Sequence, residues 1–261
     1  SSRVADLQRS IDDNQQFIRN MDAITTQLSL ADSAVDAMSN QMVRAKELAI
    51  QAANATLTDA DRQVISTELG QIIDQMLSLS NTRDAAGNYL FSGASVGTAP
   101  FVRDAAGAIV WQGSGEPPKE PLSADVTVSP GATGLSMLSI DTSGGRQTIL
   151  AALTEFKALL DDPAVDAATF ASGMEKALRD TTAGVDRLAD QRATFGSRLA
   201  QVETETDRLK ALETTMTTAK SNIESLDVAA AIVQLKSAMT LLDASQQSFA
   251  QIKKLSLFSY L

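Results

Sequence analysis

The sequence predicts a mainly α-helical protein, an elongated antiparallel helical rod from which a small β-rich module projects. Gly and Pro, which interrupt regular elements, are absent from residues 1–69 and 197–261. Five of the six Pro and ten of the fourteen Gly lie between residues 87 and 145, so the turn-forming residues gather in the middle of the chain. Aromatic residues make up only 4%, which favours aliphatic seams between helices over a globular enzyme core. Two helical arms around a turn-rich insertion follow from these observations.

The first arm carries apolar residues at steps of three and four. The stripe consists of Val4, Leu7, Ile11, Ile18, Met21, Ile24, Leu28, Ala31, Val35, Met38, Met42, Ala45, Ala49 and Ala52. Its mean spacing of about 3.5 residues is typical of a coiled-coil seam. At about 1.5 Å per residue, this helix would be roughly 75–80 Å long, which no small globular core encloses.

A second helix is expected after a short loop. Thr58 and Asp61 have the spacing of a capping box, with Asp in place of the usual Glu. The residues that follow place one apolar stripe on the helix. This stripe consists of Ile65, Leu69, Ile72, Met76 and Leu79.

The insertion contains short apolar runs between Gly and Pro residues. Tyr89–Phe91, Ala108–Trp111 and Asp125–Val128 are the expected strands. We therefore divide the chain into a first rod segment at 1–96, a β-rich outer module at 97–142, a second rod segment at 143–224 and a carboxy-terminal helix at 225–261.

The returning arm begins with a short helix that carries Ile149, Leu153, Phe156 and Leu160 and ends at Asp161-Asp162-Pro163. A long helix then starts near Asp166, and its stripe consists of Val185, Leu188, Phe195, Leu199, Val202, Leu209, Leu212, Met216, Ile223 and Leu226. Its last part continues with Val228, Ile232, Leu235, Met239, Leu242, Phe249 and Ile252. The helix that would pair with this last part would have to precede Ser1. We therefore expect these seven residues to bind another protein chain.

The polar side of this last helix mixes Lys236 and Asp243 with Gln and Ser. A membrane-surface helix is expected to be rich in Lys and Arg there, so the pattern favours protein contacts. No stretch reaches 18 consecutive apolar residues, and no secretory signal peptide is visible. We therefore expect no membrane insertion.

Composition argues against catalysis and against nucleic-acid binding. A net charge of −10 opposes contact with a phosphate backbone. The chain has no Cys and no His, which removes thiolate ligands, the commonest metal ligand and the commonest general base. We expect no catalytic, cofactor or metal site. Asp12-Asp13-Asn14 and Asp161-Asp162 are interpreted as solvated surface, because hard-cation sites need oxygens that converge from a loop.

Several segments resemble the bacterial flagellin superfamily. They are Gln16–Asn20, Ala45–Asn54, Asp61-Arg62 and Glu68 near the amino terminus, and Arg192–Gly196 on the returning helix. Two further segments, Asn81–Gly93 and Ser256–Leu261, are similar to the helix-to-hairpin segment and the ending of the hook-associated protein 3 family, the hook–filament junction branch. The resemblance covers nearly all of residues 1–95 and 145–261.

This resemblance implies a structural subunit, with a flagellin-like helical core, that joins the flagellar hook to the filament in a ring-like zone. Its implied partners are further copies of itself, neighbouring hook-associated protein and flagellin subunits, and an export chaperone that binds the carboxy-terminal helix. It implies an extracellular location, reached through the flagellar type III pathway without a cleaved signal peptide. Family members carry a further segment before the position that matches Ser1, which forms the partner helix of the inner core.

Two alternatives stay open at the level of sequence. One is flagellin, the filament subunit, and the other is a flagellin-like cell-surface protein whose β module binds a glycan, with Trp111 as a stacking residue. Tyr89–Phe91 and Ser256–Leu261 favour the junction branch. An innate immune receptor recognises part of the first two helices of flagellins, and Arg44, Leu48 and Glu68 lie at similar positions. The favoured interpretation of these three residues is a packing Leu flanked by exposed charges.

Overall fold

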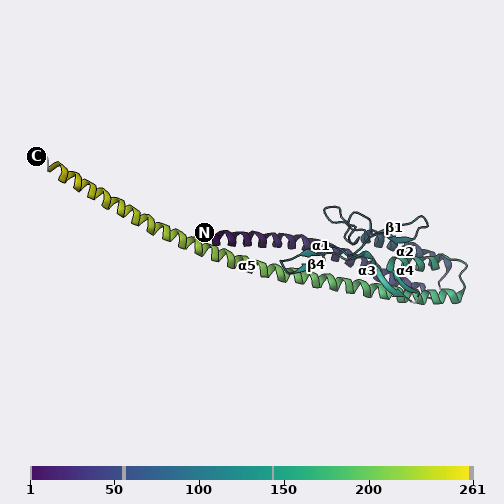
Figure 1. The fold of residues 1–261 in the computed structure, drawn as a ribbon. Helices are drawn as coiled ribbons and strands as arrows, with labels where there is room; N and C mark the ends of the chain where they lie inside the picture. The colour runs from purple at the N-terminus through teal and green to yellow at the C-terminus, as the bar shows by residue number, and fades with distance from the viewer. Residues whose placement is uncertain (1, 55–56, 143, 259–261) are drawn as a thin grey trace. The chain divides into compact units, whose positions relative to one another are not determined.

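A computed structural model describes residues 2–54, 57–142 and 144–258 of the chain. Helices dominate this part, and its strands form three two-stranded antiparallel sheets, which confirms the predicted fold class (Figure 1). The helices are α1 (Ser2–Ala52), α2 (Asp59–Ser80), α3 (Gly134–Leu138), α4 (Ile149–Asp161) and α5 (Ala167–Phe258). The strands are β1 (Phe101–Arg103), β2 (Ile109–Trp111), β3 (Glu120–Pro121), β4 (Thr127–Val128), β5 (Ser139–Thr142) and β6 (Gly145–Thr148).

The chain divides into two compact units. The larger unit comprises residues 17–206, and the smaller unit combines residues 1–16 with 207–261. Helices α1 and α5 contribute a segment to each unit, whereas all other elements belong to the larger unit.

In the larger unit, α1 and α5 run antiparallel along the predicted apolar seam. Met21 contacts Thr206, whose hydroxyl lies 3.1 Å from the sulfur, and Met42 lies over Gly184. A Cβ atom at Gly184 would meet the Met42 Cε atom at 2.7 Å, so the two helices approach closely there. The seam residues of α1 from Met21 to Ala52 are buried, which confirms the periodicity prediction for this part of the arm.

Helix α2 begins as the sequence predicts. The Thr58 side chain accepts a hydrogen bond from the Asp61 backbone, and the Asp61 carboxylate accepts one from the Thr58 backbone at 3.0 Å. The Thr58 hydroxyl also donates to the Asp61 carboxylate at 2.7 Å, and this bond together with the one from the Thr58 backbone holds the pKa of Asp61 below its ordinary value. Helix α2 packs against α4, and the buried members of its stripe include Ile65, Leu69, Ile72 and Met76.

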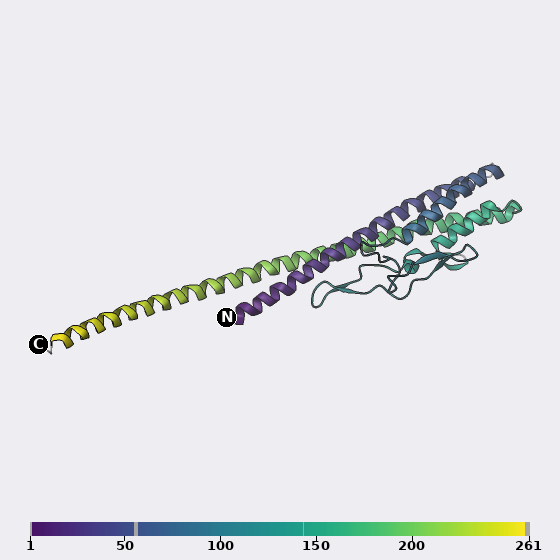
Figure 2. The same cartoon turned by 90° about the horizontal axis from the view of Figure 1, so that it is seen from above.

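Irregular loops and short strands lie on one side of the helices of the larger unit (Figure 2). Strands β1 and β2 pair in the register Phe101↔Trp111, which confirms the strand expected around Ala108–Trp111. The strand expected at Asp125–Val128 is shorter, since only Thr127–Val128 pair with Glu120–Pro121.

The strand expected at Tyr89–Phe91 is wrong. This segment forms turns with isolated bridges, one of which joins Arg83 to Tyr89. Leu90 and Phe91 are buried next to each other, whereas a strand points successive side chains to opposite faces. Gly93 adopts a φ of 72°, and a Cβ atom there would meet the Ser114 carbonyl oxygen at 2.3 Å. The chain therefore turns here so that two backbones can touch.

Helix α3 and the hairpin of β5 and β6 are not among the elements expected from sequence. The hairpin pairs Ser139 with Thr148 and so crosses the expected boundary between residues 142 and 143. The division of the chain into four segments stays a prediction. Helix α4 ends at Asp161, directly before Asp162 and Pro163, as predicted.

In the smaller unit, the start of α1 packs against α5. Asn14 is 5% exposed and donates a hydrogen bond from Nδ2 to the Leu209 carbonyl oxygen at 2.8 Å. The Gln15 amide donates to Glu213 at 2.6 Å, and the Lys220 ammonium donates to Gln8 at 2.7 Å. Asp12 and Asp13 are exposed, as expected of solvated surface. The same interpretation of Asn14 is wrong, because Asn14 is buried and lies between Ile11 and Ile18 in the apolar stripe.

Candidate functional site: the apolar face of the carboxy-terminal helix

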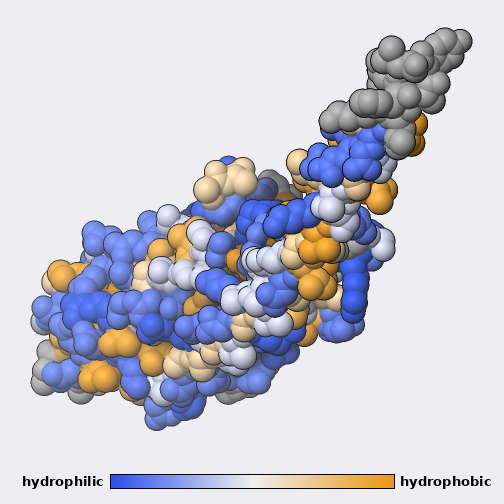
Figure 3. Space-filling view, turned by 90° about the vertical axis from the view of Figure 1, so that its left-hand side faces the viewer, coloured by the Kyte–Doolittle hydropathy of each residue, from blue (hydrophilic) through white to orange (hydrophobic). Residues whose placement is uncertain are grey.

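The end of α5 exposes the seven apolar residues that the sequence singles out. Their exposed fractions run from 54% at Ile232 to 63% at Phe249 and Ile252. The set consists of Val228, Ile232, Leu235, Met239, Leu242, Phe249 and Ile252, and we call it the arm face. Because these residues recur at steps of three, four and seven, they share one side of the helix. Figure 3 shows both apolar and polar side chains on the coloured part of this end of α5.

This exposure extends around the whole helix. Every described side chain from residue 228 to residue 252 is exposed, including the polar Lys236 and Asp243. Preceding turns of α5 are partly covered, since Leu209 is 3% exposed and Met216 and Ile223 are half-buried. The helix thus passes from a packed part to a part that presents a long apolar face to its surroundings.

One segment within Ala167–Ile252 has the length and mean hydropathy, 1.3, of a membrane span, and none of it is buried. One helix of this length and hydropathy is weak evidence for a span. The absence of membrane insertion therefore stays a prediction.

Arg44 and Glu68 lie together on the surface between α1 and α2. The Arg44 guanidinium donates two hydrogen bonds to the Glu68 carboxylate, at 2.6 and 3.1 Å, and a third to Glu47 at 2.9 Å. These bonds hold the pKa of Glu68 below its ordinary value and raise the pKa of Arg44. Leu48 is 1% exposed. The geometry matches a packing Leu flanked by charges, and a role in receptor recognition stays a prediction.

Comparisons with known proteins agree with this architecture. The bacterial flagellin N-terminal helical region matches residues 1–96, and the bacterial flagellin C-terminal helical region matches residues 178–261. Flagellar hook-associated protein 3 of Escherichia coli (strain K12) is 26% identical over 271 residues, which cover 99% of this chain and 84% of that protein. The chain belongs to the bacterial flagellin family, in its hook-associated protein 3 branch.

Solved structures of this branch share the fold. Flagellar hook associated protein-3 from Legionella pneumophila superposes with a TM-score of 0.77 at 15% identity, covering 84% of this chain and 98% of that one. FlgL from Xanthomonas campestris gives a TM-score of 0.75 at 19% identity, covering 82% and 99%.

The segments that resemble the flagellin superfamily and its hook-associated protein 3 family have definite structural roles. Asn81 ends α2, and its side chain exchanges two hydrogen bonds with the Phe101 backbone, at 2.8 and 3.1 Å. The Arg83 guanidinium lies 4.2 Å from the centre of the Tyr89 ring. On α5, Arg192 pairs with Asp36 at 2.6 Å, and Phe195 is fully buried. The ending at Ser256–Leu261 includes residues outside the described part of the chain.

Proposed function

We propose that this protein is a structural subunit of the bacterial flagellum that joins the hook to the filament. The proposal rests on its membership of the hook-associated protein 3 branch and on one structural observation, the exposed arm face of α5. An apolar face of this length, set on an otherwise exposed helix, is suited to bind other helices.

The partners of the arm face are further copies of this chain in a ring-like zone and neighbouring hook-associated protein and flagellin subunits. Before assembly, an export chaperone covers the same face. The subunit acts outside the cell, on the flagellum, and reaches it through the flagellar type III pathway without a cleaved signal peptide. It performs no catalysis, in keeping with the structural role of its family and with a sequence that lacks both Cys and His.

Energetics explain why this face would order on assembly. Burying seven such side chains contributes on the order of 10 kcal/mol, at roughly 1.5–3 kcal/mol each. Fixing the backbone costs on the order of 1–2 kcal/mol per residue, which intrahelical hydrogen bonds offset in part. An isolated helix is therefore marginal, and contacts with a neighbour decide whether it persists.

Two substitutions test the role of the face. We expect Leu235→Asp with Leu242→Asp to abolish assembly of the junction, because two carboxylates would lie in a buried helix seam. The matched control is Ser237→Asp with Ala244→Asp, which adds the same charges at the same spacing on the opposite side of the helix. Motility and electron microscopy of isolated flagella report assembly, and circular dichroism reports folding of the remaining chain.

The proposal requires that the two double variants differ in junction assembly. If both assemble normally, or if both fail equally while remaining folded, the arm face is not the assembly surface. Antibody labelling separates the junction role from that of flagellin. A single labelled band where hook meets filament supports the junction, whereas label along the filament contradicts it.

A further inference from the structure

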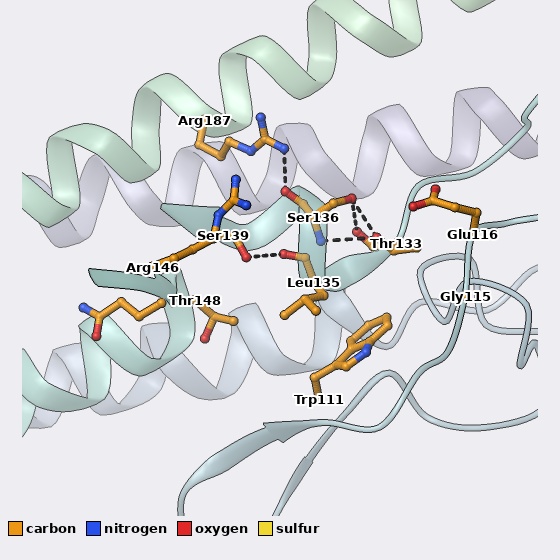
Figure 4. Close-up of a pocket in the computed structure, with 11 residues that line it drawn as sticks. Trp111, Gly115, Glu116, Thr133, Leu135, Ser136, Ser139, Arg146, Thr148 and Arg187 are labelled. Atoms are coloured by element: carbon orange, nitrogen blue, oxygen red, sulfur yellow. Dashed lines mark hydrogen bonds between the residues drawn. The ribbon is translucent and has the colours of Figure 1, made fainter. Parts of the chain in front are cut away.

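A pocket of ≈ 630 Å³ lies in the larger unit, where the end of β2, α3, β6 and α5 meet (Figure 4). Its lining includes Trp111, Glu116, Ser136, Arg146 and Arg187. Pockets that hold small ligands in proteins have volumes of about 300–1,000 Å³. This one is large enough for one or two sugar rings of an oligosaccharide, and all of its lining residues belong to the larger unit.

Trp111 forms a fixed wall of this pocket. Its ring meets the Phe101 ring edge to face, with the centroids 5.2 Å apart. Cβ atoms at Gly113 and Gly134 would lie 2.3 and 2.9 Å from the indole, so both backbones press against it. The indole is still only half-buried, which leaves part of it open to the pocket. A rigid, partly open indole provides a stacking surface at little cost in conformational entropy.

Two arginines give the pocket a positive end within an acidic protein. Arg187 donates one hydrogen bond to the Ser136 carbonyl oxygen and forms no ion pair with any described residue. Its Nε atom is buried and lacks a hydrogen-bond partner among those residues. Arg146 reaches Asp141 only at 3.6 Å, and both side chains are largely exposed, so solvent screens the pair. Figure 4 shows both guanidinium groups at one end of the pocket and Glu116 at the other.

Hydroxyl groups also line the pocket. The Ser139 hydroxyl donates to the Leu135 carbonyl, and the Thr148 hydroxyl accepts from the Ala151 backbone at the start of α4. Each hydroxyl oxygen keeps a lone pair that can accept a further hydrogen bond. An inorganic anion would use the arginines alone, and an aromatic acid would use the arginines and Trp111. A sugar acid uses all three kinds of group.

We propose that this pocket binds a sugar acid, with its carboxylate on Arg146 and Arg187 and the apolar face of its ring on Trp111. Serine and threonine hydroxyls and Glu116 then receive the sugar hydroxyl groups. This binding is additional to the junction role and does not depend on it.

The test uses the full chain and its own fluorescence. Trp111 is the only Trp of the protein, so the change in tryptophan emission reports this pocket alone. Trigalacturonate should change the emission saturably, whereas neutral galactotriose should not. Arg146→Gln should weaken binding about tenfold or more, the usual loss for a hydrogen bond to a charged group. Arg179→Gln is the matched control, since Arg179 lies exposed on α5 of the same unit and outside the pocket.

Arg187→Gln is a second variant, and its binding is measured only if its circular dichroism spectrum shows a native fold. A saturable response to trigalacturonate that is lost in Arg146→Gln and kept in Arg179→Gln supports the proposal. No saturable response, or an equal response to galactotriose, overturns it. Displacement by sulfate or by tetraglutamate with the same affinity as trigalacturonate also overturns it, because the site would then select charge alone.

Discussion

At the scale of single residues, buried polar groups tie the helices of the larger unit together. Ser66 in α2 is fully buried, and its hydroxyl donates a hydrogen bond to the Asp161 carboxylate at the end of α4. Partial burial works to raise the pKa of Asp161, but hydrogen bonds from Lys157, Ser66 and Gln63 outweigh it. The pKa of Asp161 therefore lies below its ordinary value, and its charged form stabilises the folded state.

Removing the Ser66 hydroxyl should destabilise the protein. We expect Ser66→Ala to lower the free energy of unfolding at pH 7 by about 1–2 kcal/mol, because Asp161 loses a buried donor. The exposed neighbour provides the control, and Thr67→Ala should change the free energy by less than about 0.5 kcal/mol. Urea unfolding followed by circular dichroism measures both.

The same variant has a defined pH dependence. A carboxyl whose pKa is depressed by folding stabilises the protein above its unfolded pKa of about 4 and loses that contribution as the pH falls through the folded pKa. The difference between Ser66→Ala and the parent should therefore shrink between pH 5 and pH 2. A difference that stays constant over this range would show that Ser66 acts by packing and not through Asp161.

At the scale of elements, the sequence predicted what short-range patterns encode. The seam of α1, the capping box of α2 and the end of α4 each depend on residues within one or two turns, and each is confirmed. The prediction of a strand at Tyr89–Phe91 is wrong, because Gly on both sides of a segment is compatible with a strand and with a turn. The turn is favoured by the close approach of Gly93 to the backbone of Ser114, a residue distant in sequence.

At the same scale, Asn14 sets the register in which α1 pairs with α5 in the smaller unit. A single buried Asn in an apolar seam fixes the register of two helices and costs stability. We expect Asn14→Leu to raise Tm by about 2–4 °C, which corresponds to roughly 1 kcal/mol for a chain of this size. Thermal unfolding followed by circular dichroism measures this. Asp13→Leu, at an exposed position, is the control and should leave Tm nearly unchanged.

The loss of register can be measured by crosslinking, because the chain contains no Cys of its own. Gln15→Cys with Glu213→Cys should crosslink with a short bismaleimide, since the parent side chains contact at 2.6 Å. Gln15→Cys with Lys220→Cys, one heptad further on, should crosslink only when Asn14→Leu is added. Equal crosslinking of this second pair with and without Asn14→Leu would contradict a register role for Asn14.

At the scale of the whole molecule, the sequence predicted the fold class but not the pocket at Trp111. The spacing of apolar residues along the two arms and the clustering of Gly and Pro predict a helical protein with a turn-rich insertion. The pocket combines residues near 111–116, 133–148 and 187, three segments whose meeting depends on tertiary packing. The sequence marks Trp111 as a stacking candidate, but no sequence pattern relates it to the two arginines that line the same pocket.

The packed and exposed parts of the molecule should differ in hydrogen exchange. Residues 60–80 of α2 lie in the larger unit and α2 packs against α4, whereas the described side chains from 228 to 252 are exposed. We expect backbone amides in 228–252 of the monomer to exchange far faster than those in 60–80, because an isolated helix opens readily. Mass spectrometry of deuterium uptake on a monomer verified by sedimentation measures this. Equally strong protection of both regions would contradict the proposed ordering on assembly.

The distribution of methionine has a chemical consequence. Six of the eight Met side chains, at positions 21, 38, 42, 76, 137 and 174, are buried, whereas Met239 is 60% exposed in the arm face. Peroxide converts an accessible thioether to a polar sulfoxide, which disrupts apolar contacts. The surface proposed to join one subunit to the next is thus also the one an oxidant reaches first. Under the proposed function, a neighbouring subunit covers and shields the thioether, so the chain is most open to oxidative damage before it is incorporated.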